Sequence, residues 1–186
     1  PIRALLLLIA VAVRAHAQED DGDGVDNAIP DWVYAGPFED TSQVPDQQKR
    51  TTFKLSGKDT ITATTWYAAW NGRTLRMVVS YPRYPQTQRM PLVQVFHGAG
   101  GRSVCNQTFG NAPGLYGFVL ACLDGTGRYA RGYSYGSPEN LADNARILQF
   151  IRARLPGLRI DPTRRVAAGG SMGGQDALLF GARYPD

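Results

Sequence analysis

The sequence predicts an α/β fold whose sheet is mostly parallel and begins with an antiparallel hairpin. Three observations support this class. Apolar runs at residues 91–96, 117–123 and 165–170 each lead into a glycine-containing turn, which is typical of buried parallel strands. Apolar residues at helical spacing occupy the interval between the second and third runs. Near residue 71 an Asn-Gly pair separates two β-rich runs, the usual signal of a hairpin.

Length and charge limit the class further. A chain of 186 residues, 43% of them hydrophobic, can bury one core of ordinary size. Residues 18–48 carry nine acids and no Lys or Arg, whereas residues 49–186 carry eighteen basic and seven acidic residues. The arginines are scattered rather than clustered, so we expect a solvated basic surface and no nucleic-acid partner.

Residues 1–17 have the pattern of a secretory signal peptide. Arg3 precedes a ten-residue apolar run, and Ala15-His16-Ala17 is a small-x-small cleavage site. The run is too short to span a bilayer, so we expect a secreted or periplasmic protein with no stable membrane anchor. An uncleaved anchor is the alternative. Because the sequence opens on Pro1, we also expect its true start to lie upstream.

Residues 18–48 are interpreted as an acidic linker. Asp21, Asp23 and Asp26 are spaced around glycines, and carboxylates so placed can converge on a hard cation. The segment resembles a single thrombospondin type 3 repeat, which implies structural calcium. A disordered linker that binds no metal is the other interpretation, and the sequence leaves both open.

Residues 49–186 form the remaining domain, which starts with antiparallel strands. Residues 51–56 alternate as a first strand. Residues 61–70 and 73–81 are expected to pair across Asn71-Gly72, which favours a type I′ turn. The proline-rich segment 82–91 ends the hairpin, and the Trp and Tyr residues of the hairpin are expected to pack on the sheet.

The next two strands are expected to end near a ligand site. The strand at 91–96 leads into His97-Gly98-Ala99-Gly100-Gly101, and the strand at 117–123 leads into the turn 124–127. Ligands of open α/β sheets bind beyond the carboxyl ends of the strands, so the loop 128–135 should lie near the ligand. Its tyrosines could stack on a substrate or pack the loop against the domain, and the sequence leaves both open.

Cys105 and Cys122 are the only cysteines of the chain. In an exported protein we expect a disulfide between them, which closes a loop of about 17 residues and stabilises the fold by about 3 kcal/mol. Two reduced, buried cysteines are the alternative.

A helix is predicted after the strand at 117–123. Ser137 and Pro138 suit its N-cap and first position, apolar residues continue at helical spacing to Leu155, and Pro156-Gly157 ends it. The apolar stripe is core. Residues 160–162 then turn the chain into the strand at 165–170.

The motif Gly169-Gly170-Ser171-Met172-Gly173 carries the chemistry. Gly-x-Ser-x-Gly between a strand and a helix, here expected at 176–182, is typical of a nucleophile elbow. The strained turn lifts the Ser171 hydroxyl off the sheet, and glycines leave room where side chains would collide. The Met172 N–H, at the helix N-terminus, would face a developing oxyanion. For the motif alone, a glycine-rich turn with an incidental serine is the alternative.

From about Asn71 to Asp186 the sequence resembles the first half of an α/β-hydrolase. It is most similar to the secreted esterase lineage of feruloyl esterases, acetyl xylan esterases and polyhydroxyalkanoate depolymerases, over residues 73–76, 92–101, 160–166 and 183–186. The resemblance implies an α/β-hydrolase fold, truncated after the nucleophile helix. It also implies that Ala99 or, in second place, Gly100 donates the second oxyanion hydrogen bond, while His97 is structural.

A serine nucleophile needs a base and a carboxylate that orients it, in the chain order Ser, Asp or Glu, His. No histidine follows Ser171. We therefore expect the acid and base beyond Asp186, and expect residues 1–186 alone to be inactive. The strand at 165–170 would then be an exposed apolar edge that favours aggregation. His97 as the base is the less favoured alternative.

The sequence thus predicts a secreted serine carboxylic-ester hydrolase that forms an acyl-enzyme on Ser171 and needs no catalytic cofactor. The expected partner is an ester substrate, such as an acyl ester of the plant cell wall or of a polyester. Two alternatives stay open: a serine peptidase of the prolyl oligopeptidase type, and a non-catalytic secreted binding module on a hydrolase scaffold.

Overall fold

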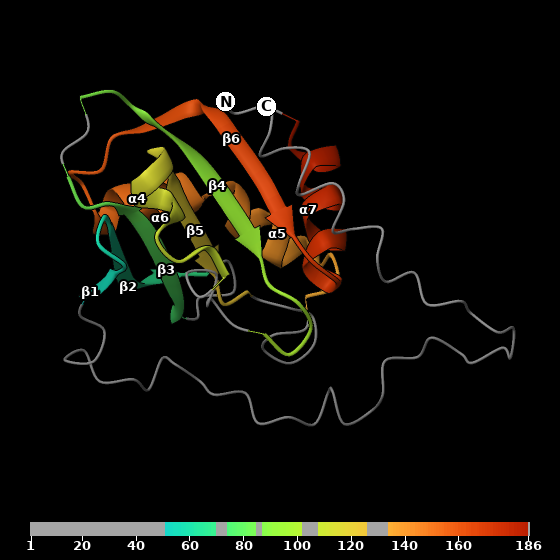
Figure 1. Ribbon diagram of the computed structural model, residues 1–186. Helices are drawn as coiled ribbons and strands as arrows, with labels where there is room; N and C mark the ends of the chain where they lie inside the picture. Colours follow the sequence, from blue (N-terminus) through green and yellow to red (C-terminus); the bar gives the residue numbers. More distant parts are fainter. Residues whose placement is uncertain (1–50, 70–73, 85–86, 102–107, 126–133, 186) are drawn as a thin grey trace, which may run out of the picture.

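The computed structural model describes residues 51–69, 74–84, 87–101, 108–125 and 134–185 of the protein (Figure 1). The strands are β1 (Thr52–Ser56), β2 (Thr60–Ala68), β3 (Thr74–Pro82), β4 (Met90–Phe96), β5 (Val119–Leu123) and β6 (Ile160–Gly169). The helices of the described residues are α4 (Ala112–Tyr116), α5 (Pro138–Ala145), α6 (Ile147–Arg154) and α7 (Met172–Arg183).

The strands form one six-stranded sheet in the order β1-β2-β3-β5-β4-β6. β1, β2 and β3 pair antiparallel, and β3 is also antiparallel to β5. β5, β4 and β6 are parallel. The predicted hairpin is confirmed as β2 and β3, and the alternating residues 51–56 add β1 to it. Three of the five pairings are antiparallel, so the sheet of the described residues is mixed rather than mostly parallel. Parallel pairing there is confined to the half of the sheet that carries the glycine-rich turns.

Helices cover both faces of the sheet. The connection from β4 to β5 moves across the sheet in one direction, and the connection from β5 to β6 moves in the opposite direction. The chain passes from β4 through α4 to β5 on one side of β4, then through α5 and α6 to β6 on the other. Right-handed crossovers in opposite directions place their helices on opposite faces. The start of α4 accordingly packs on one face with residues of β3, β4 and β5, and α6 packs on the other (Figure 1).

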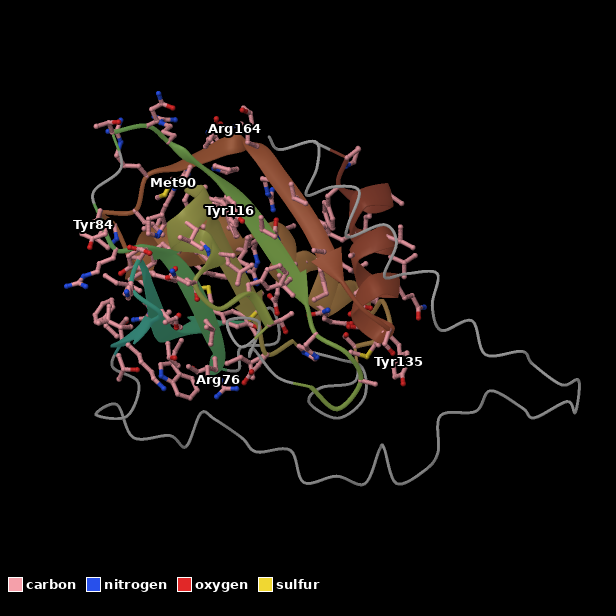
Figure 2. The ribbon with its side chains drawn as sticks, viewed as in Figure 1. Arg76, Tyr84, Met90, Tyr116, Tyr135 and Arg164 are labelled. Atoms are coloured by element: carbon pink, nitrogen blue, oxygen red, sulfur yellow. The ribbon has the colours of Figure 1, made fainter. Side chains whose placement is uncertain are left out.

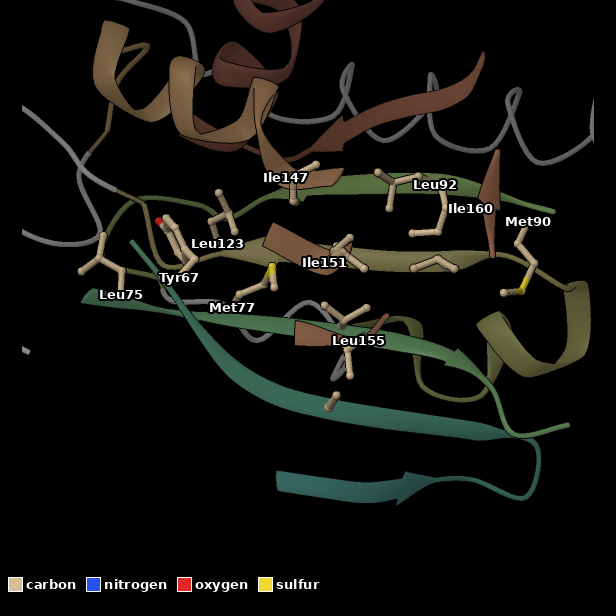
Figure 3. Close-up of a cluster of buried hydrophobic side chains, with 14 of the residues drawn as sticks. Tyr67, Leu75, Met77, Met90, Leu92, Leu123, Ile147, Ile151, Leu155 and Ile160 are labelled. Carbon is tan, nitrogen blue, oxygen red and sulfur yellow. The ribbon is translucent and has the colours of Figure 1, made fainter. Parts of the chain in front are cut away.

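The pleat of β5 divides its apolar side chains between these two faces. Val119, Ala121 and Leu123 belong to the core under α6, and Leu120 and Cys122 to the core on the α4 side. Each of these residues is at most 3% exposed, which agrees with an uninterrupted apolar strand that is buried on both faces. Ile147 and Ile151 of α6 and its C-cap residue Leu155 recur one turn apart and pack on the sheet (Figure 3).

The helix predicted up to Leu155 is broken at Arg146, between α5 and α6. Arg146 has φ −90° and ψ 3°, and its N–H donates to the Asp143 carbonyl oxygen at 3.1 Å. The buried Asp143 carboxylate also accepts from Arg146 Nη2 at 2.6 Å, which holds the break in place. Apolar spacing continues in phase across the break, so it could not reveal it. β6 also starts earlier than predicted, because Ile160 already pairs with Met90.

The strand order positions a site at the ends of β4 and β6. From β4 the chain moves to β5 on one side and returns to β6 on the other, so the direction of winding reverses at β4. In open α/β sheets, ligands bind in the crevice beyond the carboxyl ends of the strands at such a reversal. β4 ends at Phe96 and β6 at Gly169, directly before the two glycine-rich turns.

Candidate active site

Ser171 occupies the sharp turn between β6 and α7. It is the N-cap residue of α7, with φ 53° and ψ −131°, a conformation that is strained for any residue with a side chain. Ser171 is exposed and makes no capping hydrogen bond through its side chain. The Met172 N–H lies in the first turn of α7, where amides lack a helical acceptor. These are the features of a nucleophile elbow.

Two glycines of the motif are required because strand and helix approach closely. A Cβ on Gly169 would lie 2.2 Å from the Gly173 carbonyl oxygen, and a Cβ on Gly173 would lie 2.1 Å from the Phe96 carbonyl oxygen. Any side chain at either position would push α7 away from β6 or β4. A Cβ on Gly170 would meet nothing within 4 Å, so this glycine has no such steric role.

The turn after β4 lies against Ser171. A Cβ on Gly98 would be 3.9 Å from the Ser171 Cβ. The Gly98 carbonyl oxygen accepts from the Gly101 N–H at 2.9 Å, and Gly100, at φ 70°, takes the turn position that favours glycine. Ala99 and Gly100 are exposed at the tip of this turn. The turn therefore brings a second set of amides to the Ser171 side of the sheet, and which of them faces an oxyanion stays a prediction.

His97 braces the same turn. Its Nδ1 lies 2.9 Å from the Gly98 carbonyl oxygen, and its Nε2 lies 3.0 Å from the Asp124 carbonyl oxygen. The Asp124 carboxylate, fully buried at the end of β5, pairs with Arg76 of β3 at 3.3 Å. Both ring nitrogens thus face main-chain oxygens, and the imidazole ties the end of β4 to the end of β5.

Asp176 is a residue of this region that the sequence analysis missed. It is 1% exposed on α7, and its carboxylate gathers donors from three residues of the segment 134–140. Oδ1 accepts from the Gly136 N–H at 2.5 Å, and Oδ2 accepts from the Ser134 hydroxyl and, at 3.2 Å, from Asn140 Nδ2. The Ser134 hydroxyl also lies 3.7 Å from the Met172 sulfur. The carboxylate therefore fastens the loop before α5 to the first turns of α7.

The sequence did hold a signal for Asp176. Met172, Asp176 and Phe180 are buried residues of α7 and recur every four residues, so Asp176 is the charged member of a core row. A buried carboxylate needs polar partners. Those partners lie 36 to 42 residues earlier in the chain, where no local pattern connects them to α7.

Replacing Asp176 with asparagine is expected to destabilise the full-length protein by about 1.5–3 kcal/mol. The asparagine NH₂ group replaces one accepting carboxylate oxygen, so a donor then faces the donors of the loop before α5. The urea midpoint of unfolding measures this change. Asp161→Asn is the matched control: Asp161 bonds to nearby Thr163 and Arg164 on the surface, and its replacement should cost less than about 0.5 kcal/mol. Equal midpoints for the two variants would contradict the role given to Asp176.

Several predicted features lie outside the described residues: the signal peptide, the linker with Asp21, Asp23 and Asp26, and Cys105. Cys122 is buried in β5 and disulfide-bonded, and its pairing with Cys105 stays a prediction. Among the described residues, no three His, Cys, Asp or Glu side chains form a group that could hold a metal ion. In the same part of the chain, every helix is too short or too polar to cross a membrane.

Esterases and an S-formylglutathione hydrolase are among the solved structures that resemble this chain. The S-formylglutathione hydrolase from Agrobacterium tumefaciens matches with a TM-score of 0.58 at 15% identity, over 73% of this chain and 58% of that chain. The hyperthermophilic esterase from the archaeon Pyrobaculum calidifontis has a TM-score of 0.52 at 21% identity, over 67% and 40%. The acetyl xylan esterase from Paenibacillus sp. R4 has a TM-score of 0.52 at 17% identity, over 76% and 52%.

This likeness, at 15–21% identity, establishes the fold. The chain has the α/β-hydrolase fold that the sequence predicted, and it spans 40–58% of the length of these three structures. No protein-family model and no curated protein sequence matches it.

Proposed function

We propose that the protein is a serine carboxylic-ester hydrolase in which Ser171 is the nucleophile. The observation that carries the proposal is the exposed Ser171 at φ 53°, between the N-terminus of α7 and the turn that follows β4. Structures of the same fold that are named as esterases support the choice of an ester as substrate.

In the proposed reaction, Ser171 Oγ attacks the ester carbonyl carbon while its proton passes to a base. Negative charge develops on the carbonyl oxygen. The Met172 N–H and the Ala99 N–H stabilise this charge, and the Gly100 N–H is the alternative to that of Ala99. The tetrahedral intermediate then breaks its bond to the alcohol oxygen, which leaves with the proton from the base. Water attacks the acyl-enzyme in the same way, so the carboxylic acid is released and the Ser171 hydroxyl restored.

The base and the carboxylate that orients it are proposed to lie beyond residue 186. Two observations support this placement. His97, the only histidine among the described residues, already has both ring nitrogens against main-chain carbonyl oxygens. The chain also spans 40–58% of the solved structures that it resembles, so those proteins have further chain that could hold these groups.

The proposal extends to substrate and location. The ester is expected to be an acyl ester of the plant cell wall or of a polyester, and the protein to be secreted or periplasmic with residues 1–17 as its signal. The signal pattern of residues 1–17 supports the location. Two acetyl xylan esterases among the similar structures support a cell-wall ester.

The proposal is tested by offering the full-length protein p-nitrophenyl acetate and its amide analogue p-nitroacetanilide, and by labelling it with a fluorophosphonate. We expect saturable ester hydrolysis, little amide hydrolysis, and a label on Ser171 that peptide mass spectrometry locates. Comparable turnover of the amide would favour a peptidase. Absence of both ester turnover and a Ser171 label would overturn the proposal and leave a binding module.

A further inference from the structure

Two residues other than glycine have a positive φ in the described part of the chain: Ser171 at 53° and Tyr135 at 40°. This conformation is uncommon for any residue with a Cβ and is an outlier for a bulky one. Strain of this kind persists only where surrounding contacts impose it, and it concentrates at functional sites. The nucleophile elbow accounts for the positive φ of Ser171. The positive φ of Tyr135 requires a different cause.

Contacts on both sides hold Tyr135 in this conformation. Ser134 donates its hydroxyl to the Asp176 carboxylate, and the Gly136 N–H donates to the same carboxylate at 2.5 Å. Gly136 has φ 71°, and a Cβ there would lie 2.4 Å from Leu179 Cδ1, so the loop also rests against α7. A fully buried carboxylate on the nucleophile helix thus determines where the Tyr135 backbone lies.

The same contacts place Tyr135 beside the candidate active site. Ser134, its neighbour, lies 3.7 Å through its hydroxyl from the sulfur of Met172, the residue next to Ser171. Figure 2 shows Tyr135 at the end of the sheet where β6 runs into α7. Tyr135 is 42% exposed, and Leu179 of α7, in contact with this loop, is 41% exposed. An aromatic ring and an aliphatic side chain therefore remain accessible on the nucleophile's side of the fold.

We propose that Tyr135 determines specificity in the esterase reaction by contacting an aromatic ring of the substrate, in either its acyl or its alcohol part. The inference rests on the proposed function. If the loop served only to connect β5 to α5, glycine or asparagine would adopt this φ at lower cost. A tyrosine that is 42% exposed at a strained position, clamped from both sides beside the nucleophile helix, supports a role in presenting its ring to a ligand.

The test uses the full-length protein and compares three esters. Methyl acetate has no ring, methyl benzoate has a ring in the acyl part, and phenyl acetate has one in the alcohol part. For each variant we take the ratio of kcat/KM for each aromatic ester to kcat/KM for methyl acetate. Tyr135→Ala is expected to lower one of these ratios about 2- to 10-fold, the range that aromatic contacts give, and Tyr135→Phe to retain it. The ratio that falls identifies the part of the ester that meets Tyr135.

Two further variants separate this role from a structural one. Asp176→Asn is expected to lower the same ratio, because it releases the Tyr135 backbone. Tyr135→Gly should unfold at a higher urea concentration than Tyr135→Ala while showing the same low ratio, because glycine removes the φ strain. Tyr116→Ala, at a tyrosine that is 70% exposed at the end of α4, is the control and should leave both ratios unchanged.

Ratios for Tyr135→Ala that match those of the unmodified protein would overturn the inference. This outcome includes an equal fall in kcat/KM for all three esters, which leaves the ratios unchanged. A binding measurement distinguishes failure of the Tyr135 inference from failure of the proposed function. Saturation-transfer NMR with phenyl acetate and methyl benzoate on Ser171→Ala protein needs no turnover, and Tyr135→Ala in that background should weaken binding of at least one of these two aromatic esters. If no ester is hydrolysed, the proposed function fails, and this binding result alone decides whether Tyr135 contacts an aromatic ring.

Discussion

Replacing Ser171 with alanine in the full-length protein is expected to lower kcat for p-nitrophenyl acetate by at least about 10⁴-fold, the scale on which loss of a catalytic nucleophile acts. Alanine has no hydroxyl, so no acyl-enzyme can form. The fold should be retained, because Ser171 is exposed and its side chain caps nothing. Initial rates measure the activity, and the urea midpoint shows that the variant is folded.

A second serine provides the control for this substitution. Ser56 of β1 shares a hydrogen bond with Thr62 of β2, in the antiparallel part of the sheet and outside the candidate site. Ser56→Ala should keep kcat within about twofold of the unmodified protein, since the half-buried Ser56 lies away from the candidate site and its replacement leaves the Ser171 turn unchanged. A stably folded Ser171→Ala protein that kept a tenth or more of the activity would remove Ser171 from the mechanism.

Gly173→Ala is expected to lower the free energy of unfolding by about 3 kcal/mol or more and to abolish activity. The new Cβ would lie 2.1 Å from the Phe96 carbonyl oxygen and 2.7 Å from the His97 carbonyl oxygen. Both are backbone atoms and cannot rotate away. α7 would have to move off β4, and the Ser171 hydroxyl and the Met172 N–H would move with it.

Gly181→Ala, on the same helix, tests whether this effect is local. A Cβ on Gly181 would meet nothing within 4 Å, so alanine should raise the free energy of unfolding by about 0.5–1 kcal/mol through its better helix propensity. Urea midpoints and fluorophosphonate labelling of both variants provide the comparison. Equal stability of the two variants would mean that α7 does not approach β4 as closely as the structure shows.

The parallel half of the sheet and the turn at Ser171 could be predicted from sequence because their signals are local. An uninterrupted apolar run such as Val119–Leu123 must be buried on both faces, and only glycine fits where a helix leaves a strand as closely as at Gly169 and Gly173. The hairpin was also recognisable, from two alternating runs around an Asn-Gly pair.

Other features could not be predicted because their causes are distant or weak in the sequence. The helix break at Arg146 depends on a buried contact with Asp143, while the apolar stripe continues across it unchanged. The helix α4 has five residues, among them Pro113 and Gly114, which is too short for a periodic pattern. Asp176 has the sequence context of an ordinary polar residue in a helix, because its partners lie 36 to 42 residues earlier in the chain.

By itself, the sequence determined the α/β class, the antiparallel hairpin, the apolar strands and the serine at the turn after β6, because spacing and glycine chemistry act between neighbouring residues. Only the tertiary structure decided what surrounds that serine. It set His97 between two main-chain oxygens, brought the turn of Gly98 against Ser171, and joined Asp176 to the loop that carries Tyr135. These contacts join segments far apart in the chain, and they form only when the sheet orders its strands so that β4 and β6 end side by side.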